Sequence, residues 1–193
     1  MISLVFFLEE PSAKEMLNGI LPKILPKHVI PRFVVFEGKH DLEKQMVRKL
    51  RLWNTQNSCF LILRDQDSGD CLLIKRNLKE KCSQANKPNT IVRIACHELE
   101  SFYLGDLHAV DKGLKMNSLS KLQNKRKYRE PDKLANPSLE LMTLTKNRYQ
   151  KISGSRSISS HLSLENNFSH SFKVLVKAIR DISSTFENSN INH

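Results

Sequence analysis

The sequence predicts an α/β fold in which a parallel central sheet is flanked by helices and is followed by a basic helical C-terminal part. Over residues 1–110, four short apolar runs alternate with segments whose apolar residues recur at helical spacing. This strand–helix–strand order requires crossover connections, which place consecutive strands parallel in one sheet. We expect residues 111–185 to form the helical part packed on this core, and residues 186–193 a disordered polar tail.

The first two strands are expected at residues 2–8 and 32–36, because both segments are nearly continuous apolar runs that end at acidic residues. Between them, Ser12 and Glu15 form a capping-box pattern, which predicts a helix that ends near Pro22. Asp41 is expected to cap the second helix, in which apolar residues recur at helical spacing up to residue 53.

The third strand is expected at residues 59–63, where an apolar run is bounded by turn residues. Asp70 follows Gly69 and is interpreted first as the cap of a helix over residues 71–82, and only second as a ligand. The fourth strand is expected at residues 91–96. Further helical patterns cover residues 99–104, 134–144 and 172–182.

The composition favours a polyanionic partner. The 193 residues carry a formal net charge of +11, which indicates binding to nucleic acid or to an anionic membrane surface. No apolar run approaches the ~18 residues of a membrane-spanning helix, and no membrane partner is expected. The apolar N-terminus lacks a basic region before it and predicts a strand instead of a signal peptide. The four cysteines are scattered, which favours free thiols in the cytoplasm.

Acidic residues stand at the ends of three of the four expected strands. Because the carboxyl ends of parallel strands share one edge of a sheet, these carboxylates should converge there. Crowded carboxylates repel one another unless a cation lies between them, and Mg²⁺ prefers oxygen ligands. A solvated acidic loop is an equally ordinary interpretation of the D-x-D pattern by itself. The residues are Glu9 and Glu10, Asp65 and Asp67, and Glu98 and Glu100.

Glu98 and Glu100 are expected to differ in role, because residues two apart on a helix point in different directions. Glu100 is the preferred ligand or base, since it lies inside a more regular helical pattern. His97 and Glu98 begin a zinc-protease motif but lack its second histidine, so zinc is not expected. The chain also has no glycine-rich phosphate-binding loop.

A dense basic segment is a candidate contact for a nucleic-acid backbone, although it also fits a solvated helix face. Tyr128 within it could stack on an unpaired base or pack internally. Lys151 and Arg156 lie in a segment rich in glycine and serine, expected as a loop. They are candidates for stabilising charge at a scissile phosphate, or ordinary surface residues. The basic segment contains Lys121, Lys125, Arg126, Lys127, Arg129 and Lys133.

Five segments together resemble a bacterial family named only as a domain of unknown function. They read FLEEPS from residue 7, FEGKHDL from 36, LRDQDSGDC from 63, RIACHELESFYLGD from 93 and YQKISG from 149. That family is regarded as Toprim-like. It is similar to the RloB-type proteins and, more distantly, to the Toprim nuclease domain of OLD-family proteins. The resemblance extends over almost the whole chain.

The resemblance implies a Toprim-like Rossmannoid core with Mg²⁺- or Mn²⁺-dependent phosphodiester chemistry. Toprim domains carry a glutamate after the first strand, matched here by Glu9 or Glu10, and a D-x-D matched by Asp65 and Asp67. OLD-type nucleases add an acid and a lysine, for which Glu100 and Lys151 are the candidates. The resemblance also implies a neighbouring ATPase of the SMC/ABC-like type in a phage-defence or mobile locus.

The leading functional hypothesis is therefore a divalent-metal-dependent nuclease. Glu9, Asp65 and Asp67 would hold the metal with Glu100, and Lys151 would assist. The basic segment and Arg156 would hold DNA or RNA. The alternative is a non-catalytic sensor or partner subunit of an ATPase complex; phosphoryl transfer to a small molecule is a third possibility. The sequence is also compatible with a homo-oligomer.

Overall fold

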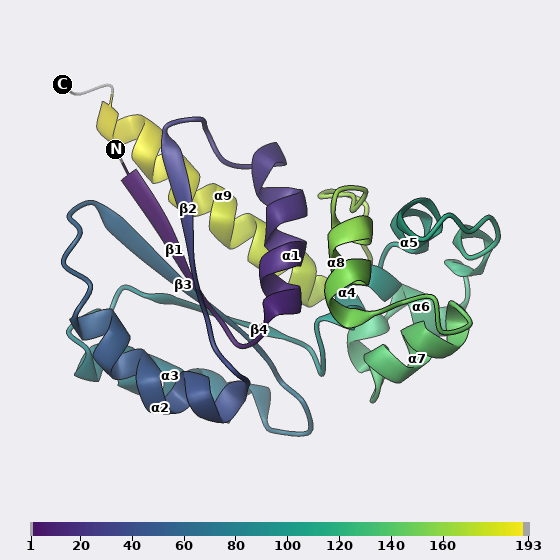
Figure 1. Ribbon diagram of the computed structural model, residues 1–193, viewed down its shortest axis with the longest axis horizontal. Helices are drawn as coiled ribbons and strands as arrows, with labels where there is room; N and C mark the ends of the chain where they lie inside the picture. Colours follow the sequence, from purple (N-terminus) through teal and green to yellow (C-terminus); the bar gives the residue numbers. More distant parts are fainter. Residues whose placement is uncertain (1, 191–193) are drawn as a thin grey trace.

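The computed structural model describes residues 2–190 and contains a four-stranded parallel sheet in the order β2-β1-β3-β4 (Figure 1). The strands are β1 (Ile2–Leu8), β2 (Val29–Val35), β3 (Ser58–Asp65) and β4 (Ile91–Ala95). Every pairing between neighbouring strands is parallel. The predicted α/β fold with a parallel central sheet is confirmed, because three crossover helices return the chain to the same end of the sheet each time.

The crossover helices are α1 (Pro11–Ile20), α2 (Lys39–Arg51) and α3 (Cys71–Gln84). Asp70 caps α3 as predicted, accepting a hydrogen bond from the backbone N–H of Leu73 at 2.9 Å. Two other predicted caps are wrong. Glu10, and not Ser12, occupies the cap position of α1, and Gly38 precedes α2 with a φ of 99°, a value that favours glycine.

The two faces of the sheet are covered by different helices (Figure 1). Side chains alternate along a strand, so residues two apart share one face. Val5 and Phe7 of β1 pack with α2 and α3. Phe6 and Leu8 pack with α1 and with the long C-terminal helix α9 (His170–Asn190). This alternation decides which acidic residues meet at the end of the sheet.

The C-terminal part is helical, as predicted, and packs on the α1 side of the core. Its helix α8 lies against α1, where Gly19 allows close approach: a Cβ at this position would come within 2.0 Å of the Ser159 hydroxyl. The short elements of this part are α4 (Glu100–Leu104), α5 (Leu107–Gly113), η2 (Ser120–Leu122), α6 (Arg126–Arg129), η3 (Pro131–Lys133), α7 (Pro137–Leu144) and α8 (Lys151–Ser159).

Two expectations about this part need correction. Lys151 and Arg156 lie in helix α8 and not in a loop, because the glycine and serines of this segment pack against Tyr149 and α1. Helix α9 continues through Asn190, so residues 186–190 are helical where a disordered tail was expected. Residues 191–193 of that expected tail lie outside the described residues.

Two expectations from composition also find support. All four cysteines carry free thiols. Among the helices within residues 2–190, none combines the length and the apolar character needed to cross a membrane.

Candidate metal centre

Three acidic residues that interact electrostatically stand at the carboxyl edge of the sheet, each from a different element. Asp65 is the last residue of β3, Glu10 directly precedes α1, and Glu100 opens α4. Asp65 and Glu100 are buried. Electrostatic repulsion acts on Asp65 from Glu100, Glu10 and Glu9, in decreasing order. We refer to Glu10, Asp65 and Glu100 as the acid cluster.

Strand parity explains why Glu10 joins this cluster more closely than Glu9. Leu61 and Leu63 of β3 face α1 and α9, so Asp65 continues on that face. Leu8 of β1 faces the same way, which places Glu10 on that side and Glu9 on the other. Either glutamate fitted the sequence pattern. The alternation along β1 is the signal that separates them.

Burial and mutual repulsion disfavour negative charge in the cluster. Burial, followed by the carboxylates of Glu100, Glu10 and Glu9, raises the pKa of Asp65 well above its usual range. Burial also raises the pKa of Glu100, although Lys151 and the Tyr149 hydroxyl act in the opposite direction. A carboxylate pair with raised pKa values in one buried site is typical of a functional centre.

The carboxylate of Glu100 is only half satisfied. Its Oε1 accepts a hydrogen bond of 2.8 Å from the buried Tyr149 hydroxyl. Its Oε2 is buried and has no hydrogen-bond partner among residues 2–190. Buried polar atoms almost always have a partner, so an orphaned carboxylate oxygen beside two further acids marks a place where a cation would be accommodated.

Lys151 supplies the nearest positive charge. Its ammonium forms an ion pair with Glu10 Oε2 at 3.2 Å, and its side chain is about half exposed. Burial by itself would lower the pKa of Lys151, but the carboxylates of Glu100, Glu10 and Asp65 raise it above its usual value. One ammonium ion therefore faces three carboxyl groups and balances only part of their charge.

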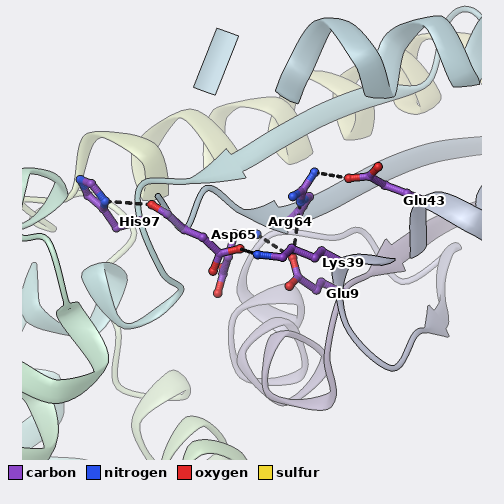
Figure 2. Close-up of polar contacts among 7 residues, drawn as sticks. Glu9, Lys39, Glu43, Arg64, Asp65 and His97 are labelled. Atoms are coloured by element: carbon purple, nitrogen blue, oxygen red, sulfur yellow. Dashed lines mark hydrogen bonds and ion pairs between the residues drawn. The ribbon is translucent and has the colours of Figure 1, made fainter. Parts of the chain in front are cut away.

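A second group of charged residues lies on the α2 side of the same edge (Figure 2). Arg64 contacts Glu43 at 2.6 Å and Glu9 at 3.8 Å, and Glu9 also accepts the backbone N–H of Asp65 at 3.2 Å. Burial raises the pKa of Glu9, and the negative charge of Asp67 raises it further. The hydrogen bond from the Asp65 backbone and the positive charge of Arg64 lower this pKa but do not outweigh burial. Glu9 thus connects this group with the acid cluster.

Asp67 is held in this second group and is partly exposed. Its carboxylate forms an ion pair of 2.7 Å with Lys39. Its backbone has a φ of 54°, and its N–H donates to the carbonyl of His97 at 2.7 Å. The ring Nδ1 of His97 lies 3.1 Å from the Asp67 carbonyl, so the loops after β3 and β4 are tied together (Figure 2).

The structure also separates Glu98 from Glu100. Glu98 Oε2 accepts the backbone N–H of Ser138 at 2.7 Å, in the first turn of α7. A carboxylate at a helix N-terminus is stabilised by the unpaired N–H groups there. Glu98 therefore has a structural partner, whereas Glu100 is the carboxylate that acts most strongly on Asp65.

The donor set fits a hard divalent cation in chemistry, since it consists of carboxylate oxygens. In the described part of the chain, however, no three His, Cys, Asp or Glu side chains are close enough together to form a ready ligand set. Mg²⁺ commonly uses one or two protein carboxylates and completes its shell with water and substrate phosphate. Asp65 and Glu100 can supply these one or two carboxylates.

The sequence model of one family, described as a domain of unknown function (DUF4276), matches residues 8–180. The chain belongs to the DUF4276 family. The matched span includes the acid cluster and Lys151. In comparisons with curated proteins and with solved structures, nothing matched the chain.

The predicted nucleic-acid contacts of this DUF4276 chain divide into two sets. Three of the basic side chains form ion pairs: Lys127 with Glu140, Lys133 with Glu130, and Arg156 with Glu15. The other four are exposed and take part in none of the ion pairs within the described residues. These are Lys121, Lys125, Arg126 and Arg129.

Tyr128 is buried, and its hydroxyl donates to Glu140 at 2.6 Å. Of the two interpretations of this residue, the structure supports internal packing. Tyr149 is the residue that sequence reasoning missed. Its position two residues before Lys151 was the available signal, but an aromatic residue in a polar segment does not reveal that its hydroxyl reaches Glu100.

Proposed function

We propose that this protein is a divalent-metal-dependent nuclease of Toprim type that hydrolyses phosphodiester bonds with Mg²⁺ or Mn²⁺. The observation that carries the proposal is the buried pair of Asp65 and Glu100, in which Glu100 Oε2 has no hydrogen-bond partner within residues 2–190. In parallel α/β sheets ligands bind at the carboxyl edge, which is where this pair lies.

In the proposed site, Asp65 and Glu100 hold the cation, and water and substrate phosphate complete its shell. Glu10 or Glu9 would join the ligands only by moving closer, because no three such side chains within the described residues form a ready ligand set. The cation would polarise the phosphoryl oxygen and orient the reacting groups. Asp67 joins this set only if its carboxylate leaves Lys39, to which it is bound at 2.7 Å. The first ligands to test are therefore Asp65 and Glu100.

Lys151 has a distinct task in this proposal. Its ammonium stands at the rim of the acid cluster, half exposed, and contacts Glu10 at 3.2 Å. An ammonium in this position can offset the negative charge that builds up on a phosphate in the transition state. It also keeps a phosphodiester from facing only carboxylates.

A polymeric substrate is favoured by charge. The chain carries a formal net charge of +11, and four cations of the segment from residue 121 to 133 are exposed and free of ion pairs within the described residues. Such residues bind phosphate backbones largely without regard to sequence. We propose that the protein acts on DNA or RNA in the cytoplasm, with an SMC/ABC-like ATPase in phage defence or a mobile element, as the likeness to RloB-type and OLD-family proteins suggests.

The test is a cleavage panel over plasmid DNA, single-stranded DNA and total tRNA, with Mg²⁺, with Mn²⁺ and with a chelator, with and without the neighbouring ATPase. The double variant Asp65→Asn with Glu100→Gln should reduce metal-dependent cleavage by at least about 10³-fold while the protein stays folded. Both replacements keep the side-chain shape and remove charge that burial disfavours.

The matched control is Glu98→Gln, two residues from Glu100. Its amide oxygen can still accept the Ser138 N–H, and cleavage should stay within about twofold of wild type. Equal cleavage by the double variant would refute the proposed site. If no substrate is cut with any metal, yet the protein co-purifies with the ATPase, the non-catalytic alternative replaces the nuclease.

A further inference from the structure

Residues 149–155 form a short segment that contacts the acid cluster at more than one point. The proposed function uses only Lys151 of this segment. Tyr149 precedes helix α8, and its hydroxyl donates to Glu100 Oε1 at 2.8 Å. The Ser155 hydroxyl lies 3.4 Å from the same Tyr149 oxygen. Both residues are buried, so this contact is shielded from water.

The Tyr149 ring is fixed by its surroundings. It packs against the Tyr103 ring with centroids 5.9 Å apart. Gly154 lies directly behind it: a Cβ at position 154 would come within 2.5 Å of the Tyr149 ring. The glycine in the first turn of α8 therefore makes room for the aromatic ring, and the ring leaves the hydroxyl little freedom in direction.

The consequence is an asymmetric carboxylate. Tyr149 occupies Glu100 Oε1, whereas Oε2 has no hydrogen-bond partner among residues 2–190. A carboxylate bound at one oxygen cannot rotate freely about its terminal torsion without losing that bond. The unpaired oxygen is thus held in one direction, on the edge of the carboxylate away from Tyr149.

We propose that Tyr149 is a positioning residue that binds Glu100 Oε1 and thereby presents Oε2 to the divalent cation of the acid cluster. This inference rests on the proposed metal-dependent function and adds the second layer of its site. Ligating carboxylates are generally hydrogen-bonded by such partners, and loss of the partner weakens metal binding about 10–100-fold. Lys151 and Tyr149, two residues apart, then contact different acids of the cluster: Lys151 contacts Glu10, and Tyr149 contacts Glu100.

The test compares Mn²⁺ binding by wild type and Tyr149→Phe, measured by calorimetry on the full chain, together with the Mn²⁺ dependence of cleavage. The variant keeps the ring and removes only the hydroxyl. We expect the dissociation constant and the half-saturating Mn²⁺ concentration to rise about tenfold, whereas the maximal rate at saturating Mn²⁺ changes by less than about threefold. A purely structural role would not produce this split.

Tyr128→Phe is the matched control for metal binding, because its hydroxyl also donates to a glutamate, Glu140, outside the cluster. Its Mn²⁺ affinity should equal that of wild type. Gly154→Ala is a second variant, which displaces the Tyr149 ring without removing the hydroxyl, and it should also weaken Mn²⁺ binding several-fold.

The outcomes separate the two proposals. Wild type that binds Mn²⁺ while folded Tyr149→Phe or Gly154→Ala binds it equally well overturns the role of Tyr149 and leaves the nuclease proposal intact. Wild type that binds no Mn²⁺ at all overturns both. Weakened binding in both variants, with Tyr128→Phe unaffected, supports the inference.

Discussion

Replacing Asp65 by asparagine should stabilise the metal-free protein, although Asp65 is the central candidate ligand. Asp65 is buried, and its pKa is raised by burial and by Glu100, Glu10 and Glu9. The folded protein therefore keeps a proton that the unfolded chain releases near pH 4. Wild type loses stability as the pH rises from about 4 towards the raised folded-state pKa, and the loss is complete above it.

The size of the effect follows from this linkage. Each pKa unit of upward shift destabilises the folded state by about 1.4 kcal/mol once the pH exceeds both pKa values. In a chain of this length that corresponds to roughly 3–6 °C in Tm. Asparagine has no charge to bury, and its amide oxygen can still accept the Leu99 N–H that Asp65 accepts. The Tm difference should be near zero at pH 4 and should grow in favour of Asp65→Asn as the pH rises to 8.

Metal should reverse the order of the two proteins. At a Mn²⁺ concentration 100 times the dissociation constant, binding stabilises the folded state by about 2.7 kcal/mol, or roughly 5–11 °C. Wild type should gain this increment and Asp65→Asn should not. The assay is thermal unfolding followed by circular dichroism from pH 4 to 8, with Mn²⁺ or with a chelator.

Asp111→Asn is the opposite control. Asp111 is also buried, but backbone N–H groups of Leu119 and Ser120 bind its two carboxylate oxygens at 3.0 and 2.8 Å. Although burial acts against them, these bonds lower its pKa, so Asp111→Asn should reduce Tm at pH 8. A lower Tm of Asp65→Asn at pH 8 without metal, or an advantage that does not grow with pH, would contradict a raised pKa of Asp65 in the folded protein.

Two further predictions concern the basic residues. Lys151→Met should lower Tm by about 2–4 °C at pH 8, the equivalent of roughly 1 kcal/mol for a half-exposed ion pair. The loss should be smaller at pH 4, because Asp65 and Glu100, whose pKa values are raised, then carry less negative charge beside Lys151; an equal loss at both pH values would contradict this electrostatic explanation. Alanine replacements of the four unpaired cations, Lys121, Lys125, Arg126 and Arg129, should reduce the slope of log affinity against log salt for duplex DNA by up to about 3.6. The ion-paired Lys127 and Lys133 should contribute less per residue. The slope is measured by fluorescence-anisotropy titrations, and an unchanged slope would show that this segment does not bind DNA.

The fold was largely predictable because its determinants are local. Continuous apolar runs, helical spacing and the cap at Asp70 each act within a few residues, and the strand order then follows from crossover connections. The caps at Ser12 and Asp41 failed because a neighbouring residue occupies the cap position in each case. The Ser12 hydroxyl turns to Glu10, and Gly38 provides the backbone conformation from which α2 begins. A sequence pattern does not show which of several neighbouring residues occupies the N-terminal cap position of a helix.

The site was predictable in outline but not in its partners. Acids at strand ends had to meet at the carboxyl edge, since parallel strands end there. The sequence placed Asp65 and Asp67 together, yet Lys39, which is 28 residues from Asp67, holds its carboxylate in a separate group. Tyr149 reaches Glu100 across 49 residues of sequence. Contacts of this range depend on how α2 and α8 pack, and short motifs do not encode that packing.

The alternation of side chains along β1 and β3 explains more of the arrangement of the acidic residues than the D-x-D motif does. It places Glu10 and Asp65 on the face that Lys151 approaches, and Glu9 towards Arg64. Glu100 comes to this place from α4, where it is bound by Tyr149. A cation bound by Asp65 and Glu100 would relieve the repulsion that raises the pKa of Asp65, whereas a cation bound by Asp67 would first have to displace Lys39. Occupancy should therefore begin at Asp65 and Glu100, with Asp67 recruited only when substrate phosphate or a second cation draws Lys39 away.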